Sequence, residues 1–406
     1  MNAQLRPIDT APARQPHRGR NITLLLAATL TIMSGATIAP SLPAIEAHFA
    51  GSDNVEILTR LVLTLPALFI VICAPFAGGL ADRFGRRPLL MAGALLYGIG
   101  GMSGLLADSL AGLLIGRAAL GIAVAGVMTT VTALVGDYFT GPARDRFMGL
   151  QAAFVGIGGL VFLTGGGLLA ELHWRAPFAV YGLSLLLIPA MLAFIKEPNL
   201  ARGTTVLAGA VGTTAWLAIA AVYFASVLNS VAYYLIPTQL PFYLNAMGIG
   251  SPTLAGFAIG LGNVVSAGVS LFYAPLRARL GVTGVFGLAF GLMATGYALL
   301  GLAGSLPAVL TAASVVGLGL GMMMPNIAAA AMTAAAPEMR GRVAGGMTAS
   351  VFAGHFISPF VSQPMIATFG FEQTYLYAGA AVGAVAIIAA GIAVFQAARV
   401  PAAVSH

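Results

Sequence analysis

Two long stretches without a charged residue constrain the fold of this chain most strongly. No Asp, Glu, Lys or Arg occurs between Arg202 and Arg277, nor between Arg279 and Glu338. A membrane-spanning helix takes roughly 20 apolar residues, so each stretch has room for more than one span. Over all 406 residues only 8% are charged, against roughly 25% in soluble domains. The chain is therefore predicted to be an all-α membrane protein that has the lipid bilayer as its surroundings.

The composition also argues against several other classes of protein. The formal net charge of +7 is compatible with nucleic-acid binding, but the basic residues form short clusters between apolar runs, with no continuous basic face. Cys73 is the only cysteine and lies inside an apolar run, so neither a disulfide framework nor a metal motif is expected. No Gly-x-x-x-x-Gly-Lys loop occurs, which argues against direct use of ATP. We expect no nucleic-acid partner, no metal and no cofactor.

Hydropathy predicts twelve transmembrane helices. Arg14, Arg18 and Arg20 precede the first apolar stretch as they would in a signal peptide, but that stretch is longer than a typical signal and has no convincing cleavage site. We therefore keep it as the first span. The predicted spans are residues 22–44, 57–80, 88–107, 110–137, 147–170, 177–195, 213–238, 252–274, 283–304, 307–334, 343–369 and 374–397.

The twelve spans divide into two parallel six-helix bundles. The prediction is a cytoplasmic tail (1–21), an N-terminal bundle (22–195), a cytoplasmic linker (196–212), a C-terminal bundle (213–397) and a second cytoplasmic tail (398–406). A shift of 196 residues supports this division, because it moves Arg83 onto Arg279, Gly85 onto Gly281 and Gly121 onto Gly317. Both halves then start on the same side, so the repeat is parallel.

The distribution of basic residues predicts the orientation in the membrane. Cytoplasmic loops carry an excess of Lys and Arg, and a cytoplasmic N-terminus places 16 of the 19 basic residues on the inside. Arg60 and Arg175 fall outside, and Arg117 lies within a span. Both termini are predicted to be cytoplasmic. The inside residues are Arg6, Arg14, Arg18, Arg20, Arg83, Arg86, Arg87, Arg144, Arg146, Lys196, Arg202, Arg277, Arg279, Arg340, Arg342 and Arg399.

The loop between the second and third spans carries the most specific motif. Residues 78–87 read GGLADRFGRR, with glycines for a tight turn and arginines suited to an anionic inner leaflet. This segment closely resembles the signature loop of the major facilitator superfamily. The motif residues are Gly78, Asp82, Arg83, Gly85, Arg86 and Arg87.

Two further segments extend the resemblance over most of the chain. Residues 117–121 (RAALG) are similar to the Arg-x-x-x-Gly motif of the superfamily, and residues 165–170 followed by 174–178 (WRAPF) resemble its bacterial drug- and metabolite-efflux branch. The chain departs from that branch where a Gly-Pro pair is usual, because residues 161–163 are VFL. The resemblance implies a monomeric transporter, not an enzyme, in the bacterial inner membrane.

The resemblance also implies a gate at the cytoplasmic end. We expect Asp137, at the inner end of span four, to pair with Arg83 or Arg87, and Asp82 to face the start of span eleven near Gly341. Pairs of this kind hold one conformation over another. The alternative is that these are ordinary helix-end charges.

Two ionisable residues inside spans are candidates for proton coupling or for an anion site, since such groups are costly in a membrane. Arg117 is either a site cation, which binds an anionic solute or responds to proton movement, or a structural cation bonded to carbonyls. His355 in span eleven is either a satisfied hydrogen-bonding residue or the carrier of proton coupling, because imidazole titrates near neutral pH.

The solute site is expected at mid-depth between the halves. Asn229 and Tyr233 lie four residues apart on one helical face and form the best pair. With Met322, Met323 and Met324 nearby, we expect an amphipathic cavity. The candidate lining residues are Thr29, Ser34, Gln151, Asn229, Tyr233, Tyr234, Asn263 and Asn326.

The predicted function is secondary transport by alternating access. Efflux of small amphipathic drug-like or metabolic compounds, with the proton gradient as energy source, is the first reading. The alternative is proton-coupled symport, or uniport, of a small organic anion. A membrane enzyme should cluster acids or histidines at one membrane face, whereas the five histidines here are scattered from His17 to His406.

Overall fold

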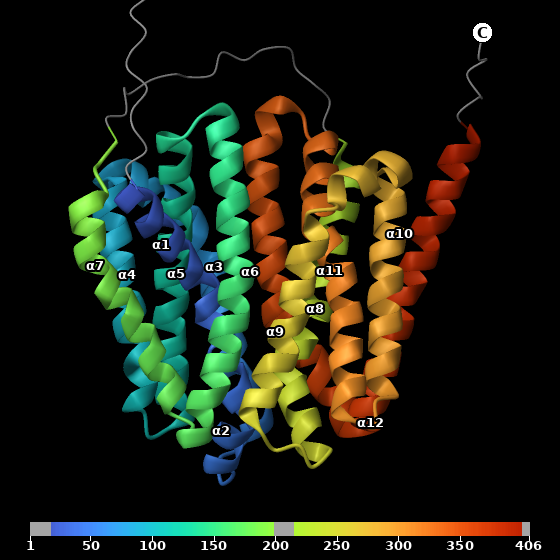
Figure 1. Ribbon diagram of the computed structural model, residues 1–406, viewed down its shortest axis with the longest axis horizontal. Coiled ribbons are helices and arrows are strands. Elements are labelled where there is room, and N and C mark those ends of the chain that lie inside the picture. Colours follow the sequence, from blue (N-terminus) through green and yellow to red (C-terminus); the bar gives the residue numbers. More distant parts are fainter. Residues whose placement is uncertain (1–17, 199–214, 400–406) are drawn as a thin grey trace, which may run out of the picture.

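The chain forms two groups of long helices that stand side by side (Figure 1). The computed structural model describes residues 18–198 and 215–399, and within these ranges all regular structure is α-helix or short 3-10 helix. Most of the predicted linker, residues 199–212, lies outside the described residues, as do most of both predicted tails.

The first half contains helices α1 to α7. Helices α1 and α2 continue one another through a 3-10 turn and form one span, and a longer 3-10 segment, Ala176–Gly182, leads into α7. The helices are α1 (Arg18–Ala36), α2 (Leu42–His48), α3 (Val55–Phe84), α4 (Arg86–Met102), α5 (Leu110–Tyr138), α6 (Gly141–Leu172) and α7 (Leu183–Phe194).

The second half contains helices α8 to α12. Among the described residues, eleven helical segments are long and apolar enough to cross a membrane, but α12 has 60 residues and breaks at Gly370, where φ is 81° and ψ is 174°. Its two parts are separate spans, so twelve spans are present, as predicted. The helices are α8 (Trp216–Ala246), α9 (Pro252–Ser270), α10 (Tyr273–Gly301), α11 (Leu306–Ala334) and α12 (Arg340–Arg399).

Each predicted span overlaps an observed helix, and the largest difference at a C-terminal end is in α8. That helix was expected to end at residue 238, but it continues through Pro237 and Pro241 to Ala246. The hydroxyl of Thr238 donates to the backbone carbonyl of Tyr234. Proline is tolerated inside membrane helices where side chains, water or neighbouring helices satisfy the backbone groups that it leaves unpaired.

The 196-residue repeat is present in the backbone geometry. Gly85 adopts φ 98° and ψ 155° between α3 and α4, and Gly281 adopts φ 67° and ψ 178° at the matching break in α10. Positive φ with extended ψ is a conformation that only glycine adopts readily. The two motif glycines therefore make the same turn in the two halves.

Helix contacts repeat in the same register. A Cβ atom built on Gly121 would lie 2.5 Å from the backbone oxygen of Pro66, and one on Gly317 would lie closer still to the oxygen of Gly262, 196 residues after Pro66. Small residues let membrane helices approach this closely. The repeat is thus a property of the packing as well as of the sequence.

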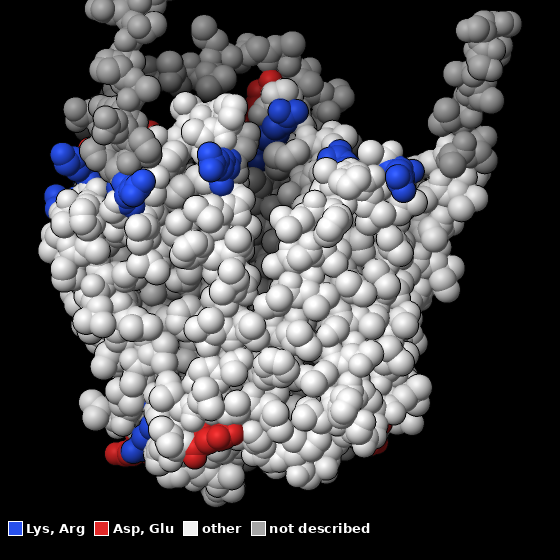
Figure 2. All heavy atoms as spheres, in the orientation of Figure 1, with Lys and Arg blue, Asp and Glu red and all other residues white. Residues whose placement is uncertain are grey.

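On the face that Figure 2 shows, the Lys, Arg, Asp and Glu side chains gather at the two ends of the molecule and leave the belt between them uncharged. Largely exposed side chains such as Ile115, Leu217 and Ile387 cover the belt, as expected for helices that face lipid. Basic residues crowd one end, which carries the α3–α4 loop; we call it the arginine-rich end and the opposite one the far end. The membrane face that each end meets stays a prediction.

Candidate substrate cavity and gates

A cavity of about 320 Å³ lies between the two halves. Helices α1, α3, α5 and α6 of the first half and α8, α9 and α12 of the second half supply its wall. Its wall is largely apolar and carries a small set of hydrogen-bonding groups, as in small-molecule sites generally. The polar and aromatic members are Thr31, Ser34, Gln151, Tyr233, Tyr234, Asn263, Phe352 and His355.

The structure therefore brings together five of the eight residues predicted to line the substrate cavity, with Tyr234 beside Tyr233 on α8. Ser34 comes from α1, Gln151 from α6, Tyr233 from α8 and Asn263 from α9. These helices belong to different halves, so the wall is assembled only when the halves meet. This arrangement matches the expected position of a solute site at the repeat interface.

Aromatic rings form one side of this cavity. The rings of Tyr234 and His355 stack with centroids 3.9 Å apart, and Tyr233 lies 5.8 Å from His355. The Tyr233 hydroxyl is 3.3 Å from Asn263 Oδ1, to which it donates. The imidazole of His355 is therefore part of the cavity wall, where α12 packs against α8.

Two of the other predicted residues lie elsewhere. Asn326 is fully buried, accepts a hydrogen bond from the Tyr273 hydroxyl at 3.2 Å and donates to the Val282 carbonyl at 3.0 Å; it joins α11 to α10. Asn229 is buried on α8 but does not line the cavity. Residues four apart share a face, yet they lie about 6 Å apart along the axis, so Asn229 and Tyr233 need not reach one pocket.

Other candidates for the wall also belong to helix packing. Met322 and Met323 are buried in the core, and Met324 is exposed on the outside of α11. The Thr29 hydroxyl donates to the Leu26 carbonyl at 2.7 Å, within its own helix. The amphipathic character of the cavity thus comes mainly from tyrosines and amides; the one methionine in its wall is Met128, and the predicted contribution of Met322, Met323 and Met324 is wrong.

Arg117 lies directly behind the cavity wall. Its side chain is buried, with the residue 1% exposed, and its Nη2 donates to the backbone carbonyl of Ser34. The Tyr181 hydroxyl donates to the same carbonyl at 3.0 Å, and the guanidinium lies 5.0 Å from the Tyr181 ring centre. Within the described part of the chain, Nε and Nη1 of Arg117 find no hydrogen-bond acceptor. Arg117 therefore does not line the cavity itself and is bonded to the lining residue Ser34.

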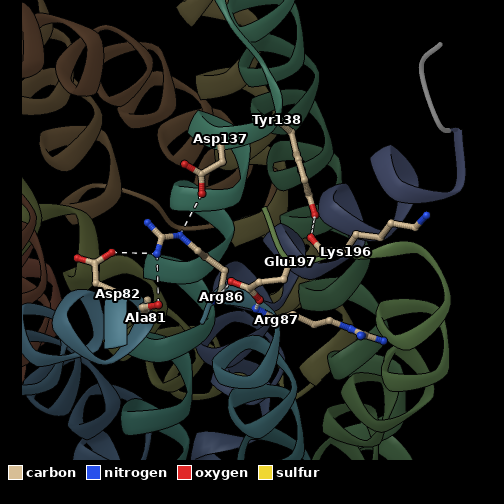
Figure 3. A network of polar contacts seen from close by, with 8 residues as sticks. All are labelled: Ala81, Asp82, Arg86, Arg87, Asp137, Tyr138, Lys196 and Glu197. Carbon is tan, nitrogen blue, oxygen red and sulfur yellow. Dashed lines mark hydrogen bonds and ion pairs between the residues drawn. The ribbon is translucent and has the colours of Figure 1, made fainter. Parts of the chain in front are cut away.

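The signature loop forms a charged network at the arginine-rich end (Figure 3). Arg86 is its centre: Nε lies 3.0 Å from Asp137 Oδ2, and Nη1 lies 2.9 Å from Asp82 Oδ1. The predicted pairing of Asp137 with Arg83 or Arg87 is therefore wrong. The turn at Gly85 starts α4 at Arg86, and the structure brings the side chain of Arg86 to the end of α5.

The predicted position of Asp82 is also wrong for this conformation. Its carboxylate is 72% exposed and pairs with Arg86 of the same loop. No heavy atom outside the immediate chain lies within 4 Å of a Cβ built on Gly341, so Asp82 does not contact Gly341 in this conformation.

Glu197 is a member of this network that the sequence analysis missed. Its two carboxylate oxygens accept from the backbone N–H groups of Arg86 at 2.6 Å and Arg87 at 2.8 Å. An acid at a helix N-terminus satisfies unpaired donors and interacts favourably with the helix dipole. The feature that points to such a partner is the glycine at the N-cap of α4, because it has no side chain that could accept from the first N–H groups of the helix.

A second polar cluster closes the far end, and we call it the far-end latch. Arg60 of α3, only 2% exposed, forms an ion pair with Glu46 of α2 and donates from Nε to Gln239 Oε1 of α8 at 3.1 Å. Gln239 Nε2 then donates to Ser362 Oγ of α12 at 2.9 Å. Sequence analysis had noted Arg60 only as an outside charge, although its place in α3 marked it as ionisable within a span.

Helix packing reinforces this closure. Ser251, just before α9, donates to Glu171 of α6 at 2.7 Å. Close by, α6 and α9 pack so tightly that a Cβ on Gly167 would clash with the backbone oxygen of Pro252. By contrast, the contacts of Arg86, Asp137 and Glu197 at the other end all stay within one half. Figure 2 accordingly shows the surface hollowed between the halves toward the arginine-rich end.

Twelve spans in two repeated halves, with a cavity between them that is closed at one end, define a helical membrane transporter. The chain belongs to the Major Facilitator Superfamily, whose sequence profile matches residues 24–359 and, in a second match, residues 222–404. It is a multi-pass membrane protein of a transporter family.

Similar proteins include bacterial resistance and export proteins. The chain is 34% identical over 178 residues to the class C tetracycline resistance protein of Escherichia coli, 28% over 187 residues to multidrug resistance protein 1 of Bacillus subtilis, and 31% over 168 residues to the bacillibactin exporter of Bacillus subtilis. These alignments cover 41%, 44% and 39% of this chain, and 43%, 46% and 41% of the relatives. The matched stretches thus span less than half of each relative.

Solved structures share the fold over nearly the whole chain. A bacterial homologue of the human lysosomal transporter Spinster, in an inward-facing and occupied conformation, aligns with a TM-score of 0.73 at 17% identity and covers 93% of this chain and 96% of that one. The D-xylose-proton symporter aligns with a TM-score of 0.72 at 16% identity and covers 91% of this chain and 96% of that one. At these identities the likeness concerns the fold.

Proposed function

We propose that this protein exports small amphipathic compounds across a bacterial inner membrane by alternating access, with proton antiport as the source of energy. The central cavity between the halves, closed at the far end by the Arg60–Gln239 contact, is the observation that carries the proposal. A site between two related halves becomes accessible from each side in turn when one half rocks against the other.

The proposed orientation follows from the charges. Cytoplasmic loops of membrane proteins are enriched in Lys and Arg, so we assign the arginine-rich end and both termini to the cytoplasm. The cavity then opens toward the cytoplasm in this conformation, where a compound to be exported would enter. In the opposite conformation, Asp82 would approach Gly341 and the far-end latch would be open.

The orientation is tested by labelling two engineered cysteines in a Cys73→Ala background. Gly51→Cys places a thiol in the exposed loop after α2 at the far end, and Ala143→Cys places one at the start of α6. A membrane-impermeant maleimide added to intact cells should label Gly51→Cys alone. Labelling of Ala143→Cys alone would reverse the orientation.

Export, as the direction of transport, is supported by the relatives named above, two of which are called resistance proteins and one an exporter. Proton coupling is supported by the position of His355, which stacks on Tyr234 in the cavity wall. Imidazole is the side chain that gains or loses charge near neutral pH, and a substrate in the cavity would compete for the same space. The proton would then leave when the compound binds.

Flux in proteoliposomes tests this function. Export of an amphipathic fluorescent compound should accelerate when the imposed gradient drives protons in the direction opposite to the compound. His355→Ala should remove this acceleration, while exchange of the compound without a gradient persists. His173→Ala is the matched control, since His173 follows α6 outside the cavity. Flux that is indifferent to the gradient in the native protein would reject antiport.

The second candidate is symport, or uniport, of a small organic anion. One observation favours it: Arg117 is buried next to the cavity, and two of its guanidinium nitrogens, Nε and Nη1, have no acceptor in the described residues. The same experiment separates the two, because a symporter accumulates its solute in the direction of the proton gradient. A uniporter equilibrates its solute with or without the gradient.

A further inference from the structure

We infer that the central cavity accepts uncharged or anionic aromatic compounds and discriminates against permanent cations. This inference rests on the proposed function, in that it takes the cavity to be the place where the substrate binds. It adds the charge of the substrate, which neither the fold nor the similar proteins specify. Three observations carry it.

The first observation is the absence of acidic side chains from the cavity wall. None of the residues that line it is Asp or Glu. Every acidic residue in the described part of the chain lies in a loop, in the first or last turns of a helix, or beside the break at Gly370. A cation that leaves water needs a counter-charge or it is strongly disfavoured. The cavity offers none at mid-depth.

The second observation is the positive charge of Arg117. The guanidinium is buried and has no ion-pair partner in the described residues, whereas Arg60, the other buried arginine, pairs with Glu46. Arg117 does not line the cavity itself, but it holds the carbonyl of the lining residue Ser34 together with Tyr181. The negative end of that carbonyl is therefore turned away from a ligand. An uncompensated charge at this position repels cations and attracts anions.

The third observation concerns the aromatic wall, which is the remaining route by which cations bind. Cations are attracted to the open face of a tyrosine ring. Here the His355 imidazole covers a face of Tyr234 with centroids 3.9 Å apart and an angle of 19° between the planes. The Tyr233 hydroxyl is held by Asn263. The wall thus offers flat apolar surface and neutral hydrogen-bonding groups such as Gln151.

Equilibrium binding of three matched probes to the purified, full-length protein tests the inference. Naphthalene-2-sulfonate, naphthalene-2-sulfonamide and 2-naphthyltrimethylammonium share one ring system and carry charges of −1, 0 and +1. The anion and the neutral sulfonamide should bind, and the cation should bind at least about tenfold more weakly, which corresponds to about 1.4 kcal/mol. Cation binding within a few-fold of the sulfonamide would overturn the inference.

An isosteric substitution tests the cause. Gln151→Glu places a carboxylate in the cavity wall with almost no change in shape. It should raise affinity for the cation and lower affinity for the anion, each by about tenfold, and leave the sulfonamide little changed. Gln396→Glu makes the same chemical change at an exposed site near the end of α12 and should alter none of the three.

A second variant provides an independent test in case the first does not fold. Asn263→Asp introduces the same charge from α9, on the opposite half, and should shift the preference in the same direction. An unchanged order of affinities in both variants, with native-like elution of the protein in gel filtration, would overturn the inference. If no probe binds and no compound is moved in proteoliposomes, the proposed transport function is wrong. This result is distinct from an unchanged charge preference, which would overturn only the present inference.

Discussion

Arg60 of α3 donates a hydrogen bond to Gln239 of α8 at 3.1 Å, and this contact joins the two halves at the far end. Both side chains are buried, and the ion pair with Glu46 and the bond to Ser362 complete the latch. A buried charge that loses a partner is costly. The latch therefore favours the conformation in which this end is closed.

Removal of the amide should open the far end. Gln239→Leu keeps the volume but leaves Arg60 without its bond across the halves, and a hydrogen bond to a charged group contributes about 1.5–3 kcal/mol. We expect the population open at the far end to rise by about tenfold or more. Spin labels at Gly51 and Ala246, one in each half at this end, would report the change as a longer distance. An unchanged distance distribution would remove the latch role.

The two carboxylates that meet Arg86 should differ in importance. The Asp137 side chain is 18% exposed and that of Asp82 is 72% exposed, and exposed ion pairs contribute only about 0–1 kcal/mol. In this conformation Asp137→Asn should therefore destabilise the arginine-rich end more than Asp82→Asn does. Thermal unfolding of the two variants in detergent measures the difference, and equal effects would contradict the geometry.

Transport separates stability from gating in the same pair of variants. If Asp82 contacts span eleven only in the other conformation, Asp82→Asn should slow turnover while its unfolding temperature stays close to native. Flux at matched protein amounts in proteoliposomes measures this. Native turnover in both variants would show that these residues are helix-end charges without a gate role.

Glu197 should stabilise α4. Glu197→Ala removes both acceptors for the first N–H groups of this helix, and loss of a helix cap costs about 0.5–2 kcal/mol. We expect a lower unfolding temperature with little change in probe binding, because the cap lies far from the cavity. Glu338→Ala, in the turn before α12, is the control. An equal effect of the two substitutions would contradict the capping role.

The paired glycines should be equally intolerant of a methyl group. Gly121→Ala would meet the backbone of α3, and Gly317→Ala would meet the backbone of α9, where neither neighbour is a flexible side chain. Overpacking of this kind costs about 1–3 kcal/mol. Gly291→Ala is the control, since no heavy atom lies within 4 Å of its Cβ position. Folded protein recovered after detergent extraction measures the effect; normal recovery of both variants would contradict the packing.

Residue patterns were sufficient for the architecture. Charge-free stretches and hydropathy located twelve spans, because a helix in lipid must be long, apolar and internally hydrogen-bonded. The 196-residue shift located the repeat, because Gly85 and Gly281 make a turn that few other residues permit. Hydropathy and a glycine turn are each determined by a single short segment of the chain. They can therefore be predicted from the sequence directly.

The partners of side chains were harder to anticipate. Asp137 was expected to meet Arg83 or Arg87 and meets Arg86, because the direction of an arginine at a helix start depends on the turn before it. Glu197 and Gln239 were missed altogether, since each acts on a helix far away in the chain. Spacing on a single helix placed Tyr233 correctly and Asn229 wrongly.

The sequence by itself determined that this is a twelve-span transporter with two repeated halves, and it identified most of the groups that line the cavity. Only the tertiary structure decided which end is closed, which arginine is paired and which is left bare beside the cavity. The reason is physical: hydropathy and turn geometry are local properties, whereas an ion pair or a hydrogen bond between halves depends on how separate helices are packed. Arg60 and Arg117 are the same residue type, but their neighbours in the folded protein differ: Arg60 is part of the far-end latch, and Arg117 has no ion-pair partner in the described residues.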